Sequence, residues 1–121
     1  MNVTYRQLST IAAALCAVLA VVLTFAPGLI YWLFQVGAHE SAGFMARRAA
    51  MLFVGLGLIA WLGRDAAPSD LRRAICTGFA IMMAGLGLLG TVEFLRGFAG
   101  PGIFLAVAAE ALFAIAYWRL R

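Results

Sequence analysis

The chain contains no lysine and little charge of either sign. All nine basic residues are arginine, and charged residues make up 12% of the 121 residues, whereas hydrophobic residues make up 65%. Soluble domains carry about a quarter charged residues, so this composition excludes an ordinary soluble domain and indicates an integral membrane protein. A formal net charge of +4, scattered along the sequence, is too small for a nucleic-acid-binding face, and no nucleic-acid partner is predicted.

Cysteine and histidine are too few and too scattered to build a metal or redox site. Cys16 and Cys76 lie in separate apolar runs rather than in a CxxC pair, so we expect two buried thiols and no disulfide. The single histidine, His39, has no second ligand at metal spacing. The sequence also lacks a recognisable nucleophile or cofactor motif. We therefore predict no catalytic residue, no metal, no cofactor and no enzymatic activity.

Four long apolar runs are present, and an α-helix needs roughly 20 such residues to cross about 30 Å of hydrocarbon. The predicted membrane spans are 8–26, 42–63, 71–98 and 102–118. Pro27 and Gly28 end the first span, and Ser41 is the expected N-cap of the second. Residues 29–36 place Tyr and Trp where aromatic rings favour the headgroup level, which predicts an interfacial elbow. Because the connections are short, we expect one all-α domain over residues 1–121, an antiparallel four-helix transmembrane bundle.

Arginines are distributed unequally between the two ends of such a bundle, because an even number of spans places both termini and the middle loop on one face. That face would carry Arg6, Arg64, Arg72, Arg73, Arg119 and Arg121. The opposite face would carry Arg47, Arg48 and Arg96. Since positive residues accumulate on the cytoplasmic side, we predict that both termini are cytoplasmic.

Charged residues within the spans gather toward the predicted outer half of the bundle. Glu110 lies in an apolar run, where an unpaired charge costs at least a few kcal/mol. It shares a helical face with Ala106 and Ala114, small residues that favour close helix contact and hence the bundle interior. Arg48 lies at a similar depth in the second span, whereas Arg47 covers a more lipid-like face. We therefore predict a buried ion pair between Arg48 and Glu110.

Glu93 and Arg96 complete the polar set, since their i, i+3 spacing allows them to pair on one helix. The predicted binding or buried polar cluster is Arg47, Arg48, Glu93, Arg96 and Glu110. Such a cluster can lock helices together, bind a ligand or ion, or take part in catalysis, and the sequence leaves these alternatives open. The inner half of each span is expected to be nearly pure hydrocarbon.

The order of these features resembles that of a bacterial family of small four-helix integral membrane proteins. The features are an uncharged first span ending at Ala26-Pro27-Gly28-Leu29, a glycine-rich second span entered at Arg48, a third span ending in Glu93 and Arg96, and Glu110 in the last span. That family is catalogued as a domain of unknown function and is distantly similar to DoxX-like proteins. The resemblance implies the same four-helix fold and a location in the bacterial inner membrane, and it implies no activity.

Two functional hypotheses follow from the predicted cluster. The first is a non-enzymatic binding or accessory bundle, with membrane lipid around it and a polar pocket in its outer half. Its predicted partners are a small apolar or amphipathic ligand, another membrane protein, or further copies of the chain through small-residue faces. The alternative is a proton- or ion-coupled small-molecule transporter that uses Glu110 as its intramembrane acid.

Overall fold

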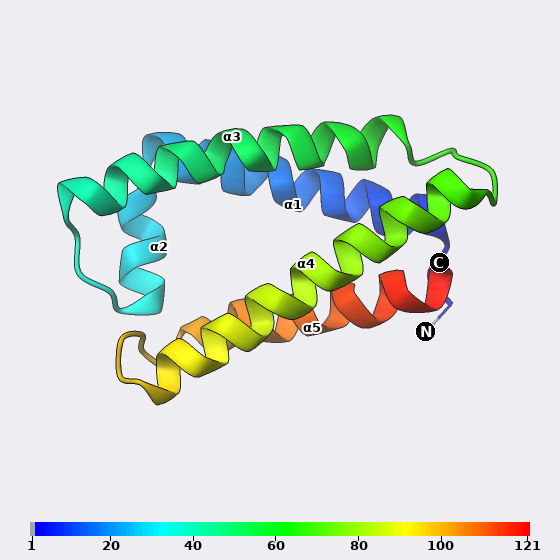
Figure 1. Ribbon diagram of the computed structural model, residues 1–121. Helices are drawn as coiled ribbons and strands as arrows, with labels where there is room; N and C mark the ends of the chain where they lie inside the picture. Colours follow the sequence, from blue (N-terminus) through cyan, green and yellow to red (C-terminus); the bar gives the residue numbers. More distant parts are fainter. Residues whose placement is uncertain (1) are drawn as a thin grey trace.

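The computed structural model describes residues 2–121, and this part of the chain contains helices and no strand. The elements are α1 (Tyr5–Phe25), α2 (Pro27–Phe34), α3 (Glu40–Leu62), α4 (Asp70–Leu95) and α5 (Ile103–Leu120) (Figure 1). Helices α1, α3, α4 and α5 are long and apolar enough to cross a membrane. The predicted fold class is therefore confirmed, and the chain is a four-span integral membrane protein with a short helix after the first span.

Local chemistry explains where the first helices begin and end. Thr4 and Gln7 form a capping box at the start of α1: the Thr4 side chain accepts from the Gln7 backbone N–H at 3.2 Å, and the Gln7 side chain accepts from the Thr4 N–H at 3.1 Å. Pro27 occupies the first turn of α2, where a missing N–H costs nothing. Helix α3 begins two residues earlier than expected, because its N-cap is His39 and not Ser41.

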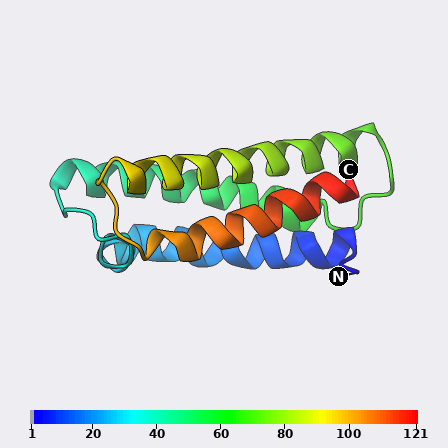
Figure 2. The same cartoon turned by 90° about the horizontal axis from the view of Figure 1, so that it is seen from below.

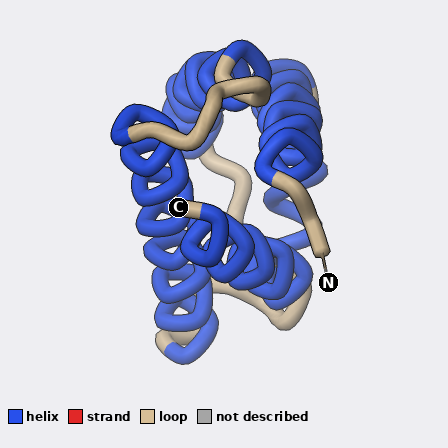
Figure 3. The backbone as a smooth tube through the Cα atoms, turned by 90° about the vertical axis from the view of Figure 1, so that its right-hand side faces the viewer, coloured by secondary structure: helices blue, strands red, loops and turns tan. Residues whose placement is uncertain are grey.

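The long helices pack as two antiparallel pairs, α1 with α3 and α4 with α5, and α1 also contacts α2 and α5. Both termini and the 63–69 connection lie at one end of the bundle, here called the terminal end, which faces the viewer in Figure 3. Helix α2 and the 96–102 connection lie at the opposite end, here called the elbow end (Figures 1 and 2). Helix α4 crosses the bundle obliquely, so that α3 and α4 are closer at the terminal end than at the elbow end (Figure 1).

The buried core lies near the terminal end. Its members are Tyr5, Leu8, Ala12, Ala13, Ala60, Cys76, Phe79, Ala80 and Tyr117. The rings of Phe79 and Tyr117 stack with their centroids 5.0 Å apart, which joins α4 to α5. Many large apolar side chains elsewhere are exposed, as expected for a surface that contacts lipid.

Candidate functional site

Glu110 lies half-buried on α5 and faces α4. A Cβ placed on Gly87 of α4 would lie 3.7 Å from Glu110 Oε2, so the two helices approach closely beside the carboxylate. The predicted buried ion pair with Arg48 is wrong. Residues 2–121 contain three ion pairs, none of which involves Glu110 or is buried.

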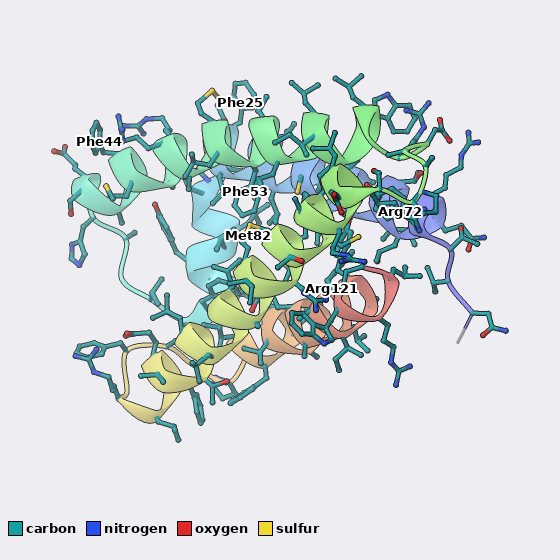
Figure 4. All side chains as sticks on the ribbon, turned by 45° about the vertical axis from the view of Figure 1, so that its right-hand side comes forward. Phe25, Phe44, Phe53, Arg72, Met82 and Arg121 are labelled. Carbon is teal, nitrogen blue, oxygen red and sulfur yellow. The ribbon has the colours of Figure 1, made fainter. Side chains whose placement is uncertain are left out.

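The arrangement of the helices explains why Arg48 does not reach Glu110. Helix α3 packs along α1, whereas Glu110 faces α4. Arg47 and Arg48 are both exposed, and the Arg48 guanidinium lies 5.9 Å from the centroid of the Phe44 ring on the same helix. Figure 4 shows Phe44 on the outer side of α3. Arg48 therefore contacts an aromatic ring on its own helix instead of an acid on another.

Glu93 and Arg96 do pair with each other, as their spacing predicts. Arg96 Nη1 donates to Glu93 Oε1 at 3.3 Å near the end of α4. The pair is partly exposed and local, so its contribution to stability is small, typically below about 1 kcal/mol. It does not bring Glu93 to Glu110. The five predicted residues thus form one local pair and three separate side chains, and their role as a binding cluster stays a prediction.

A polar cluster that the sequence did not predict lies in the core at the terminal end. Ser9 Oγ and Tyr117 Oη are 3.4 Å apart, and both residues have an exposed fraction of 0%. Tyr5 Oη is also enclosed and has no hydrogen-bond partner among residues 2–121. The Arg72 guanidinium lies 4.2 Å from the centroid of the Tyr5 ring. This half of the bundle is therefore not pure hydrocarbon.

Uncharged polar residues are harder to place from the sequence than charged ones, because burying them costs less and their presence in an apolar span is common. One signal was available in the first span: Tyr5 and Ser9 are four residues apart and continue into the stripe of Ala12, Ala13 and Cys16. Residues spaced by three or four positions share a helix face. A helix face that begins with polar residues and continues with small ones is expected to contact another helix and not lipid.

The elbow end holds a second arrangement, in which the turn before α5 rests on the end of α2. Gly100 N donates to Phe34 O at 2.7 Å. A Cβ on Gly100 would overlap the Gln35 side chain, and a Cβ on Gly102 would overlap the Leu33 carbonyl oxygen. Gln35 ends α2 in the left-handed conformation, with φ of 54°. Only glycine at positions 100 and 102 therefore lets the turn before α5 lie against the end of α2. This contact joins α2 to the α4–α5 pair.

A groove of about 640 Å³ opens beside this contact. It is lined by Gly28, Tyr31, Trp32, Leu33, Gln35, Val36, Ala38, Pro101 and Gly102. Its size lies within the range of roughly 300–1,000 Å³ found for small-molecule sites. Tyr31 Oη, in its wall, is enclosed and lacks a hydrogen-bond partner among residues 2–121. We call this site the elbow groove.

The elbow groove has an uncharged wall of aromatic, apolar and amide groups. Its wall combines the aromatic rings of Tyr31 and Trp32 with the side-chain amide of Gln35, and it contains no charged side chain. Across residues 2–121 no three His, Cys, Asp or Glu side chains converge as metal ligands would. The groove lies at the end of the bundle where the polar pocket was expected, but none of the five predicted cluster residues lines it.

No known protein family, curated protein or solved structure matches this chain. The resemblance to a bacterial family of small four-helix membrane proteins, itself distantly similar to DoxX-like proteins, therefore stays a prediction.

Proposed function

We propose that this protein is a non-enzymatic membrane bundle that binds a small amphipathic molecule in the elbow groove. The observation that carries the proposal is the groove itself, a hollow of about 640 Å³ between α2 and the Pro101-Gly102 turn. Its wall is mostly apolar with few polar groups, which is the usual composition of a small-molecule site.

The position of the groove favours an amphipathic occupant. Helix α2 joins the end of one candidate span to the start of the next, and the Trp32 side chain is 78% exposed. Tryptophan and tyrosine prefer the boundary between hydrocarbon and headgroups. Amphipathic molecules concentrate at the same boundary, so the groove opens where such a ligand would be most abundant.

A quenching experiment tests this proposal directly. Trp61→Phe and Trp118→Phe leave Trp32 as the only tryptophan, and the protein is placed in phosphatidylcholine vesicles. The probe is 4-hydroxy-TEMPO benzoate, an amphipathic nitroxide ester. We expect quenching of Trp32 that saturates with probe concentration, above a linear background from probe dissolved in the lipid.

A variant that fills the groove supplies the control. Ala38 lines the groove and is exposed, so Ala38→Phe occupies space without disturbing the core. It should weaken the saturable phase about tenfold, equivalent to losing about 1.4 kcal/mol of binding. Ala108→Phe places the same ring on the exposed face of α5 and should change nothing. Strictly linear quenching that is identical in both variants contradicts the proposal.

The membrane orientation belongs to the same proposal. We place both termini in the cytoplasm of a bacterial inner membrane, because most arginines lie at the terminal end and arginine accumulates on that side. A membrane-impermeant maleimide should label Ala67→Cys only in inside-out vesicles and Gly37→Cys only in right-side-out vesicles. The reverse pattern contradicts this orientation.

One observation favours the transporter as a second candidate. Glu110 is half-buried inside a candidate span and has no ion-pair partner among residues 2–121. An acid in this setting is typical of proton relays. In liposomes loaded with pyranine, ethidium added outside should then drive a proton flux that Glu110→Gln abolishes. A flux equal in both proteins, or absent from both, excludes this candidate.

A further inference from the structure

The terminal end carries an excess of positive charge that its own acids do not neutralise. Asp65 forms ion pairs with two of the arginines at this end. Its carboxylate lies 3.2 Å from Arg6 Nη1 and 3.8 Å from Arg64 Nε. The others are Arg72, Arg73, Arg119 and Arg121, and none of them has an acidic partner among residues 2–121. This end of the bundle therefore keeps a strong attraction for an anion.

Three of these arginines, Arg72, Arg73 and Arg121, line one groove at the ends of α4 and α5. The groove encloses about 240 Å³ and is lined by Pro68, Ser69, Arg72, Arg73, Leu120 and Arg121. Figure 4 shows Arg72 and Arg121 near the terminal ends of α4 and α5. Asp70 begins α4 beside the groove, but it is exposed and forms no ion pair with these arginines. We call this site the arginine groove.

Two of the three guanidinium groups are held in place by aromatic rings. Arg72 lies 4.2 Å from the Tyr5 ring centroid, and its Nη1 donates to Ala66 O at 3.4 Å. Arg121 lies 4.1 Å from the Trp118 ring centroid. A guanidinium held over a ring loses less conformational freedom when it binds a ligand. These arginines are therefore arranged for binding before any anion arrives.

We propose that the arginine groove binds the phosphate of an anionic phospholipid headgroup. Planar guanidinium groups bind phosphate through paired hydrogen bonds. The groove lies at the ends of candidate spans, where lipid phosphates lie, and Leu120 and Pro68 give it an apolar edge on which an acyl chain can continue. Basic pockets between transmembrane helices are known to bind such headgroups. This proposal is independent of the elbow groove, which lies at the other end of the bundle.

The first test uses the unaltered protein in detergent micelles and measures its thermal unfolding midpoint. Phosphatidylglycerol should raise the midpoint with a saturable dependence on its mole fraction, because a ligand that binds only the folded state stabilises it. Phosphatidylcholine at the same mole fractions should not. Equal effects of the two lipids overturn the proposal. An equal rise with inorganic phosphate alone assigns the groove to a free anion and also overturns it.

The second test compares two double variants that remove the same charge from the same end. Arg73→Gln with Arg121→Gln removes two of the arginines that line the groove, whereas Arg6→Gln with Arg119→Gln removes two arginines outside it. Native mass spectrometry counts the phosphatidylglycerol retained by each. The groove variant should bind it about 100-fold more weakly, since each lost charge-assisted hydrogen bond between a guanidinium and the phosphate weakens binding at least about tenfold. The control should stay within about twofold of the original affinity.

Equal losses in the two double variants would mean diffuse attraction without a defined site, and would overturn the proposal. If the groove variant does not fold, Arg121→Gln alone is compared with Arg119→Gln alone. These single changes lie outside the buried core. The elbow-groove proposal is unaffected by either result, because its probe reports on Trp32 alone.

Discussion

The contact between the elbow and the turn before α5 makes a strong prediction for Gly102→Ala. The backbone of Gly102 has φ of −60° and ψ of −20°, so alanine is conformationally acceptable there. Its Cβ, however, would overlap the Leu33 carbonyl oxygen, which is a backbone atom and cannot rotate away. Helix α2 must move off the turn and lose the 2.7 Å hydrogen bond from Gly100 N to Phe34 O.

The size of the effect follows from these two losses. Forcing an extra carbon into a packed contact costs about 1–3 kcal/mol. Losing the hydrogen bond adds about 1 kcal/mol. We therefore expect Gly102→Ala to lower the free energy of unfolding by about 2–4 kcal/mol, with the loss arising at the elbow end.

Unfolding by sodium dodecyl sulfate in mixed micelles, followed by circular dichroism, measures this change. The matched control is Gly55→Ala on α3, where an added Cβ meets nothing within 4 Å. That change should stabilise the helix by about 0.5–1 kcal/mol, because alanine loses less backbone entropy than glycine. If Gly102→Ala and Gly55→Ala change the free energy of unfolding equally, α2 does not rest on the turn before α5. The described wall of the elbow groove would then be incorrect.

Three further predictions concern the interior. Tyr117→Ala should cost about 3–5 kcal/mol of unfolding free energy, whereas Tyr117→Phe keeps the ring stacking and should cost about 1 kcal/mol or less; equal losses in the same assay would contradict the packing of this ring. Glu110→Gln should not lower the thermal unfolding midpoint, because no ion pair is lost; a large drop would mean that a charged partner exists after all. Cys16 and Cys76 have exposed fractions of 1% and 0%, so a maleimide should label them only after denaturation, and rapid labelling in the folded state would contradict their burial.

The helices could be predicted from the sequence because their signals are local. Apolar runs of spanning length, the break at Pro27 and the short turn after Gly63 locate the four long helices and the elbow. The bounds found in the structure differ from the predicted ones only at the helix ends, where capping residues such as His39 decide the result.

The partners of each helix could not be predicted in the same way. Helical spacing says which residues share a face, but not which helix covers that face. Arg48 and Glu110 lie at matching depths, yet α3 packs on α1 while Glu110 faces Gly87 of α4. The expected ion pair required α3 and α5 to be neighbours, and no residue of the sequence encodes that directly.

Two pairs of glycines, Gly55 with Gly57 on α3 and Gly85 with Gly87 on α4, illustrate the same limit. One glycine of each pair approaches a neighbouring helix. An added Cβ on Gly57 would lie 3.2 Å from Cys16 Cβ, and one on Gly87 would lie 3.7 Å from Glu110 Oε2. Gly55 and Gly85 have nothing within 4 Å. The spacing of the glycines predicts a close contact between helices, but it cannot identify which glycine of a pair makes that contact.

The alanines of the core have a consequence for how sequences of this fold can change. Lipid tails are as apolar as leucine, so exchanging one apolar side chain for another on the outer surface barely alters the free energy. Ala12, Ala50 and Ala60 are fully enclosed, and any larger residue there would push neighbouring backbones apart. Natural variation should therefore be limited on the outside by the cost of placing a polar residue against lipid, and on the inside by volume.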